Sequence, residues 1–136
     1  MKPEDVTLLI VEDDEELREA LIFDYEQVGF RVISASNGKI AFDIMKTQKV
    51  DIILSDIRMP GGDGVELLKK IRQLNPDIPI LMFITGFSDI TPQEAIKLGA
   101  HKVFEKPFNR QVILSEIYKA IDLLVGMQSL AGGTSL

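Results

Sequence analysis

Five short runs of apolar, mostly branched residues alternate along the 136-residue chain with stretches that have helical periodicity. These runs predict strands at residues 6–11, 31–35, 50–55, 80–84 and 102–105. Because a helix follows each strand, the strands are expected to run parallel, with right-handed crossovers that cover both faces of the sheet. The alternation therefore predicts an α/β fold, a doubly wound five-stranded parallel sheet flanked by five helices.

Capping residues and glycines set the predicted ends of the helices. Counting the capping residue where there is one, helices are expected at residues 15–28, 37–45, 63–74, 91–98 and 109–125. The fourth begins with Thr-Pro-Gln-Glu, a capping box with proline at the first helical position, so it is expected to start late and be short. Gly126 is expected to stop the fifth helix. This predicts a domain at residues 1–125 and a flexible tail or truncated linker at residues 126–136.

The composition limits the classes of function. A chain of 136 residues is long enough for one domain with its own core. The net charge of -6 argues against direct nucleic-acid binding, and there is no cysteine for a disulfide or a thiolate zinc site. No apolar run approaches the roughly 20 residues of a membrane span. We therefore expect a cytoplasmic protein without membrane contact.

Polar residues stand at the carboxyl ends of four predicted strands. Glu12 and Asp13 follow the first strand, Asp56 follows the third, and Thr85 and Lys106 follow the fourth and fifth. In a doubly wound sheet of order 2-1-3-4-5 the site lies at this edge, between strands one and three. A pair of carboxylates about 4 Å apart repel each other by roughly 4 kcal/mol at an effective dielectric near 20. A divalent cation would offset this repulsion, and Mg2+ fits best because it accepts carboxylates and keeps room for a phosphate.

Each of these residues also has a structural explanation. Asp13 or Asp14 could cap the first helix. Asp56 could be a turn residue, Thr85 could bond to the backbone, and Lys106 could be a solvated charge. Together these explanations require four coincidences at one edge of the sheet, so a functional site is the favoured interpretation.

Four motifs, in this order and at these separations, resemble the receiver domain of two-component response regulators. They are Leu-Ile-Val-Glu-Asp-Asp at residues 9–14, Ser-Asp-Ile-Arg-Met-Pro-Gly-Gly-Asp-Gly at 55–64, Ile-Thr-Gly at 84–86 and Glu-Lys-Pro-Phe at 105–108. The resemblance covers about residues 6–125 and implies the flavodoxin-like fold with strand order 2-1-3-4-5.

The resemblance implies a role for each residue around the carboxylates. Asp56 resembles the phosphoacceptor, which takes a phosphoryl group from a histidine kinase or from a small phosphodonor. Asp13 and Asp56 resemble the direct Mg2+ ligands, and Glu12 resembles the residue that acts through a bound water. The main-chain carbonyl of Arg58 resembles the third protein ligand.

The resemblance also implies a conformational switch. Thr85 resembles the switch hydroxyl and Lys106 the lysine that pairs with the phosphoryl group, and the bond from Lys106 to Pro107 is expected to be cis. Phosphorylation is expected to draw in Thr85 and residues 86–90, with output through the fourth and fifth helices. One position departs from the family pattern, because Val103 replaces the usual aromatic residue.

Two phenylalanines beside these motifs raise separate questions. Phe104 follows Val103, but alternate residues of a strand face opposite sides, so its ring is expected to point into the other layer. Phe87 lies two residues after Thr85, and we expect it to slow the loss of phosphate by obstructing water. The alternative is that Phe87 is an exposed loop aromatic.

The expected partners are a sensor histidine kinase or a phosphotransfer protein and, downstream, a protein or an output domain. A homodimer through the fourth and fifth helices is left open. Three other functions are weighed against the switch. A flavin or nucleotide binder conflicts with the acids at residues 12–16, and an aspartyl phosphatase would need a second acid where Arg58 stands. A receiver-like docking module that works without phosphorylation is the remaining alternative.

Overall fold

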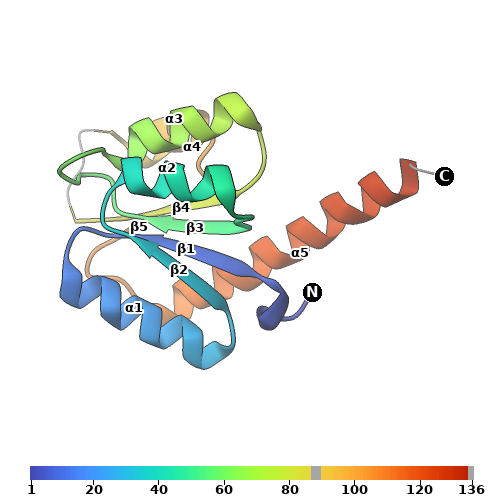
Figure 1. Ribbon diagram of the computed structural model, residues 1–136, viewed down its shortest axis with the longest axis horizontal. Helices are drawn as coiled ribbons and strands as arrows, with labels where there is room; N and C mark the ends of the chain where they lie inside the picture. The colour runs from blue at the N-terminus through green and yellow to red at the C-terminus, as the bar shows by residue number, and fades with distance from the viewer. Residues whose placement is uncertain (87–89, 135–136) are drawn as a thin grey trace.

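The computed structural model of the protein describes residues 1–86 and 90–134. Its strands are β1 (Thr7–Val11), β2 (Arg31–Ala35), β3 (Ile52–Ser55), β4 (Ile80–Thr85) and β5 (Lys102–Glu105). They form one parallel sheet in the order β2-β1-β3-β4-β5 (Figure 1). The predicted doubly wound α/β fold and its strand order are confirmed.

The five α-helices begin at the predicted caps. They are α1 (Glu15–Val28), α2 (Gly38–Thr47), α3 (Gly64–Leu74), α4 (Pro92–Lys97) and α5 (Arg110–Thr134), and an additional 3-10 turn, η1 (Pro3–Asp5), was not predicted. Asn37 and Asp63 accept backbone N–H groups of the first turns of α2 and α3. Thr91 forms the predicted capping box with Glu94, and α4 is the short helix expected. Each cap satisfies an N–H group that the helix itself leaves without a partner.

The predicted end of the fifth helix at Gly126 is wrong, because α5 continues to Thr134. A glycine ends a helix where its backbone turns left-handed, as at Gly29 with φ 115°, but Gly126 does not have a positive φ. Inside an exposed helix a glycine costs only about 1 kcal/mol relative to alanine. The later part of α5 extends beyond the sheet (Figure 1). The division of the chain at residue 125 stays a prediction.

The two faces of the sheet carry separate apolar layers. Leu8 packs in the layer with α1 and α5, and Leu9 packs in the layer with α2, α3 and α4 on the opposite face (Figure 1). The same alternation places Phe104 in the first layer and Val103 in the second, as predicted. Because β1, β3 and β4 are covered on both faces, they are apolar throughout and the polar residues fall at their ends. Among the described residues, no helix is long and apolar enough to cross a membrane.

Candidate functional site

The site lies where the neighbouring strands β1 and β3 end. The pairing Val11↔Ser55 is the last of their register, so Glu12 and Asp56 leave the sheet side by side. The N–H of Asp56 donates to the carbonyl of Val11 at 2.9 Å, which continues the ladder by one residue. This pairing brings together acids that are 44 positions apart in the sequence.

Three acids form a cluster at this edge. Glu12, Asp13 and Asp56 each place a carboxylate oxygen within 4.8 Å of the others. Glu12 is buried, Asp56 is partly buried and Asp13 is exposed. At such a separation, each charged pair repels by about 3 kcal/mol at an effective dielectric near 20. Hard carboxylate oxygens grouped in this way, open to solvent on the Asp13 side, fit a divalent cation.

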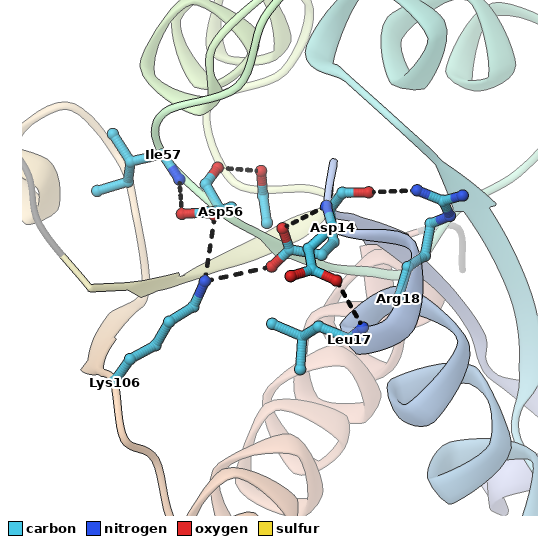
Figure 2. Close-up of polar contacts among 8 residues, drawn as sticks. Asp14, Leu17, Arg18, Asp56, Ile57 and Lys106 are labelled. Carbon is cyan, nitrogen blue, oxygen red and sulfur yellow. Dashed lines mark hydrogen bonds and ion pairs between the residues drawn. The ribbon is translucent and has the colours of Figure 1, made fainter.

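Lys106 supplies one positive charge to the cluster. Its Nζ lies 3.2 Å from Oδ2 of Asp56 and 3.4 Å from Oε1 of Glu12 (Figure 2). Burial acts to lower the pKa of Lys106, but the charges of Asp56 and Glu12 outweigh it and raise the pKa above its usual value. One ammonium against three carboxylates leaves the site short of positive charge. The arrangement can therefore accept a further cation without a change of fold.

Glu12, the buried acid of the cluster, has a clearly raised pKa. Burial raises the pKa of Glu12 to about 7, although the N–H of Asp14 donates to its Oε2 at 3.1 Å. The neighbouring Asp13 and Asp56 raise this pKa further, while Lys106 lowers it. A buried carboxylate with a raised pKa beside a specific charged partner marks Glu12 as a candidate functional group.

The carboxylate of Asp56 is fixed by contacts on both of its oxygens. Oδ1 accepts the N–H of Ile57 at 2.7 Å, and Oδ2 faces Lys106 (Figure 2). The chain then folds back, with the N–H of Gly64 donating to the carbonyl of Ile57 at 2.7 Å. A side chain at Gly64 would overlap the main-chain carbonyl oxygen of Asp56. Glycine at this position allows α3 to start directly against the site.

Thr85 and Arg58 lie near the cluster but outside the acid group. Thr85 ends β4 and is buried, and its carbonyl accepts the N–H of Lys106 at 2.8 Å. Arg58 lies in the connection from Asp56 to α3, with an exposed side chain. The structure thus places Glu12, Asp13, Asp56, Thr85 and Lys106 at one edge of the sheet and Arg58 beside it. The functional roles of all six residues stay predictions.

Three further predictions differ in their outcome. The Lys106–Pro107 bond is cis, as expected. The choice between Asp13 and Asp14 is decided, because Asp14 caps α1 by accepting the N–H of Leu17 at 3.1 Å (Figure 2). Phe87 lies outside the residues that the structure describes.

Sequence reasoning missed one contact at the site. Nη1 of Arg18 donates to the carbonyl of Glu12 at 2.8 Å (Figure 2). This bond ties the turn that carries the acids to the first turn of α1. The signal for it was the position of Arg18 one turn after the cap Asp14, where a long side chain points back toward the helix start.

Comparison with known proteins assigns the chain to a family. The family model described as response regulator receiver domain matches residues 8–118. The chain therefore belongs to the receiver domains of two-component signalling. Members of this family are phosphoacceptors rather than enzymes with an external substrate, and they interact with histidine kinases or phosphotransfer proteins and with output domains.

Individual relatives agree with this assignment. The chain is 34% identical to the response regulator receiver protein CpdR of Brucella abortus, over 84% of this chain and 95% of that protein. It is 32% identical to sporulation initiation phosphotransferase F of Bacillus subtilis, over 85% and 94% of the two chains. Several other relatives are longer, and the chain spans 22% to 56% of their length.

A solved structure shows the same fold. The response regulator TrrA of Thermotoga maritima, crystallised in complex with Mg2+-BeF, matches with a TM-score of 0.76 and 25% identity. The match covers 85% of this chain and 98% of that one.

Proposed function

We propose that this protein is a phosphorylation-dependent signalling switch that accepts a phosphoryl group on Asp56. The observation that carries the proposal is the position of Lys106, whose Nζ bridges Asp56 and Glu12 within a cluster of three acids. A carboxylate nucleophile needs nearby positive charge, since the phosphoryl group brings more negative charge to the same edge. The alternative of a docking module that works without phosphorylation does not account for this group of charges.

We propose Mg2+ as the cation of the site. Asp13 and Asp56 would hold it directly, Glu12 through a water, and the main-chain carbonyl of Arg58 would be the third protein ligand. When bound, Mg2+ supplies charge neutralisation for the carboxylates and the incoming phosphoryl oxygens. Support comes from the acid cluster, and from TrrA, which was crystallised with Mg2+-BeF.

The proposed chemistry is a transfer between two nucleophiles. A carboxylate oxygen of Asp56 forms a bond to phosphorus as the bond from phosphorus to the donor breaks, and the donor leaves with that electron pair. The donor is a phosphohistidine of a kinase or phosphotransfer protein, or a small acyl phosphate. The new bond removes the negative charge of the Asp56 carboxylate, so Lys106 then pairs with a phosphoryl oxygen. Catalysis here is mainly positioning and charge neutralisation.

We propose that the phosphoryl group then acts as an internal ligand. The hydroxyl of Thr85, at the end of β4, would donate to a phosphoryl oxygen, and the chain that follows toward α4 would shift with it. The short α4, with only six residues, has little helical structure to resist this movement. Because Val103 stands where the family usually has an aromatic, the switch would work without the usual rotation of that ring.

The partners follow from the same proposal. A sensor histidine kinase or a phosphotransfer protein would supply the phosphoryl group, and a downstream protein or output domain would read α4 and α5. A homodimer through α4 and α5 is a second way to read the same surface. We place the end of the receiver domain near residue 125, with the rest of α5 as a linker. The cytoplasmic location and the absence of nucleic-acid and membrane contacts stay predictions.

The experiment that tests the proposal is a mass measurement after incubation with acetyl phosphate. The protein is expected to gain the mass of one phosphoryl group with Mg2+ and none with a chelator. Asp56→Asn keeps the size of the side chain and is expected to gain nothing. A parent protein that gains no mass with Mg2+, or an Asp56→Asn variant that gains as much as the parent, contradicts the proposal.

A further inference from the structure

The first residue of α2, Gly38, contacts the connection between Asp56 and α3. The N–H of Gly38 donates to the carbonyl of Gly62 at 2.9 Å. Neither residue belongs to the acid cluster, and they are 24 positions apart in the sequence. The contact therefore joins the start of α2 to the loop of residues 57–63 that leaves the site.

There is no room for a side chain on either side of this contact. A Cβ on Gly38 would lie 2.8 Å from the carbonyl oxygen of Asp63 and 3.0 Å from that of Gly62. A Cβ on Gly62 would lie 3.0 Å from the backbone nitrogen of Lys39, and Gly62 also has φ 138°, which other residues rarely adopt. All of these neighbours are backbone atoms, so they cannot rotate away. The two backbones must separate if either glycine is replaced.

The same loop is fixed at its inner end by the site itself. The N–H of Ile57 donates to Oδ1 of Asp56, and the N–H of Gly64 donates to the carbonyl of Ile57. These two hydrogen bonds hold Ile57, the first residue of the loop, and the bond from Gly38 holds Gly62, near its end. Arg58, whose carbonyl is the proposed third metal ligand, lies between these two attachments. Its position therefore depends on both.

We propose that Gly38 is a positioning residue for the metal site: by holding Gly62, it fixes the loop that presents the Arg58 carbonyl next to Asp56. This inference rests on the proposed function. Gly38 has no charge and no side chain, so it acts only through the path of the backbone. Groups that hydrogen-bond directly to a metal ligand change metal affinity by about 10- to 100-fold when they are replaced, and Gly38 acts one step further away, through Gly62.

The test is the Mg2+ affinity of Gly38→Ala, measured by calorimetry on the whole chain. We expect the Mg2+ affinity to fall by about tenfold, the lower end of the range seen when groups that support metal ligands are replaced. Phosphorylation by acetyl phosphate is expected to be slow at low Mg2+ and to approach the parent rate at saturating Mg2+. This split distinguishes a displaced ligand from a general loss of structure, which saturation with Mg2+ would not repair.

The matched control is Gly126→Ala. It makes the same chemical change at a helical glycine whose added Cβ would have nothing within 4 Å. Its Mg2+ affinity is expected to equal that of the parent. Equal Mg2+ affinity in Gly38→Ala and Gly126→Ala overturns the positioning role, even if Gly38→Ala unfolds more easily.

A second variant keeps the test decisive if Gly38→Ala does not fold. Asn37→Ala removes the side chain that caps α2 by accepting the N–H of Ile40 at 2.9 Å, so it loosens the start of α2 without adding an atom. A smaller fall in Mg2+ affinity is expected, and unchanged affinity overturns the inference. A parent protein that neither binds Mg2+ nor takes up phosphate overturns the proposed function itself.

Discussion

Two aspartates bracket β3, one at each end of the sheet, and both are largely buried. The side chain of Asp51, before the strand, is 6% exposed, and that of Asp56, after it, is 12% exposed. At the amino end, Oδ2 of Asp51 accepts the N–H of Thr7 at 2.8 Å, and Lys49 lies 3.9 Å from its other oxygen. The negative charge of Asp51 thus has a hydrogen-bond donor on one oxygen and a lysine near the other, and the bond to Thr7 ties the starts of β1 and β3 together.

At the carboxyl end of β3, negative charges outnumber positive charges. Asp56 shares its edge with Glu12 and Asp13, and Lys106 is the only cation in ion-pair contact with it among the described residues. Burial therefore does not distinguish Asp56, the carboxylate proposed to be functional, from the structural Asp51. What distinguishes them is the excess of negative charge around Asp56, which can accept another cation.

The largest expected difference separates the two aspartates directly. Asp56→Ala is expected to lose all phosphoryl uptake, because the proposed nucleophile is gone. Asp51→Ala is expected to keep uptake but to lose about 1 kcal/mol of unfolding free energy, because the N–H of Thr7 that loses its partner is only partly buried. Mass measurement and urea unfolding of both variants check this. Loss of uptake in a folded Asp51→Ala would erase the distinction between the two ends.

Two lysines give the next contrast. Lys106→Met is expected to slow uptake from acetyl phosphate by roughly 100- to 1000-fold, the usual cost of removing one group that stabilises developing charge. Lys49→Met, at the opposite end of the sheet, is expected to leave the rate unchanged. The rates follow from mass spectra taken over time at saturating Mg2+. Equal rates for the two variants would show that Lys106 is only a structural counterion.

The raised pKa of Glu12 predicts a pH dependence of the unfolding free energy. Since burial raises this pKa from 4.5 to about 7, the folded state binds a proton that the unfolded state has lost in this window. Without Mg2+, Glu12 therefore stabilises the fold fully below about pH 4.5 and loses this contribution as the pH rises through 7, by up to about 1.4 kcal/mol per pH unit. Glu12→Gln is expected to flatten this slope in urea unfolding between pH 5 and about 7 with a chelator. Parallel slopes for parent and variant would contradict the assignment.

The smallest expected effect concerns stability at the amino end. The side chain of Lys49 is 79% exposed and lies 3.9 Å from Asp51. Exposed pairs of this kind contribute about 0–1 kcal/mol, so Lys49→Met is expected to change unfolding free energy by less than about 1 kcal/mol. Urea unfolding at low and high salt checks this. A salt-dependent loss larger than that would mean that Asp51 depends on its cation as Asp56 does.

Local signals in the sequence predicted most of the fold. Alternating apolar runs gave the strands, and caps such as Asn37, Asp63 and Thr91 gave the helix starts, because both depend on neighbours in the chain. The predicted end of α5 was wrong because the sequence does not give the φ of a glycine. Gly126 does not have the positive φ that would end the helix. The cis bond between Ile78 and Pro79 also had no local signal.

The site was predictable because parallel strands bring their carboxyl ends to one edge. The sequence could place Asp56 and Lys106 there, but not the burial that raises the pKa of Glu12, since that depends on packing from several elements. The contact between Gly38 and Gly62 could not be predicted from the sequence either. It joins the starts of two different crossovers, and only coordinates reveal such a fit between backbones.

The bridge made by Lys106 spans 94 positions to Glu12 and 50 positions to Asp56. It closes only when the first, third and last strands of the sheet have all joined. A chain that has built half of its sheet holds the acids without their lysine. Under the proposed function, a chain with an incomplete sheet therefore lacks the positive charge that phosphoryl uptake on Asp56 needs.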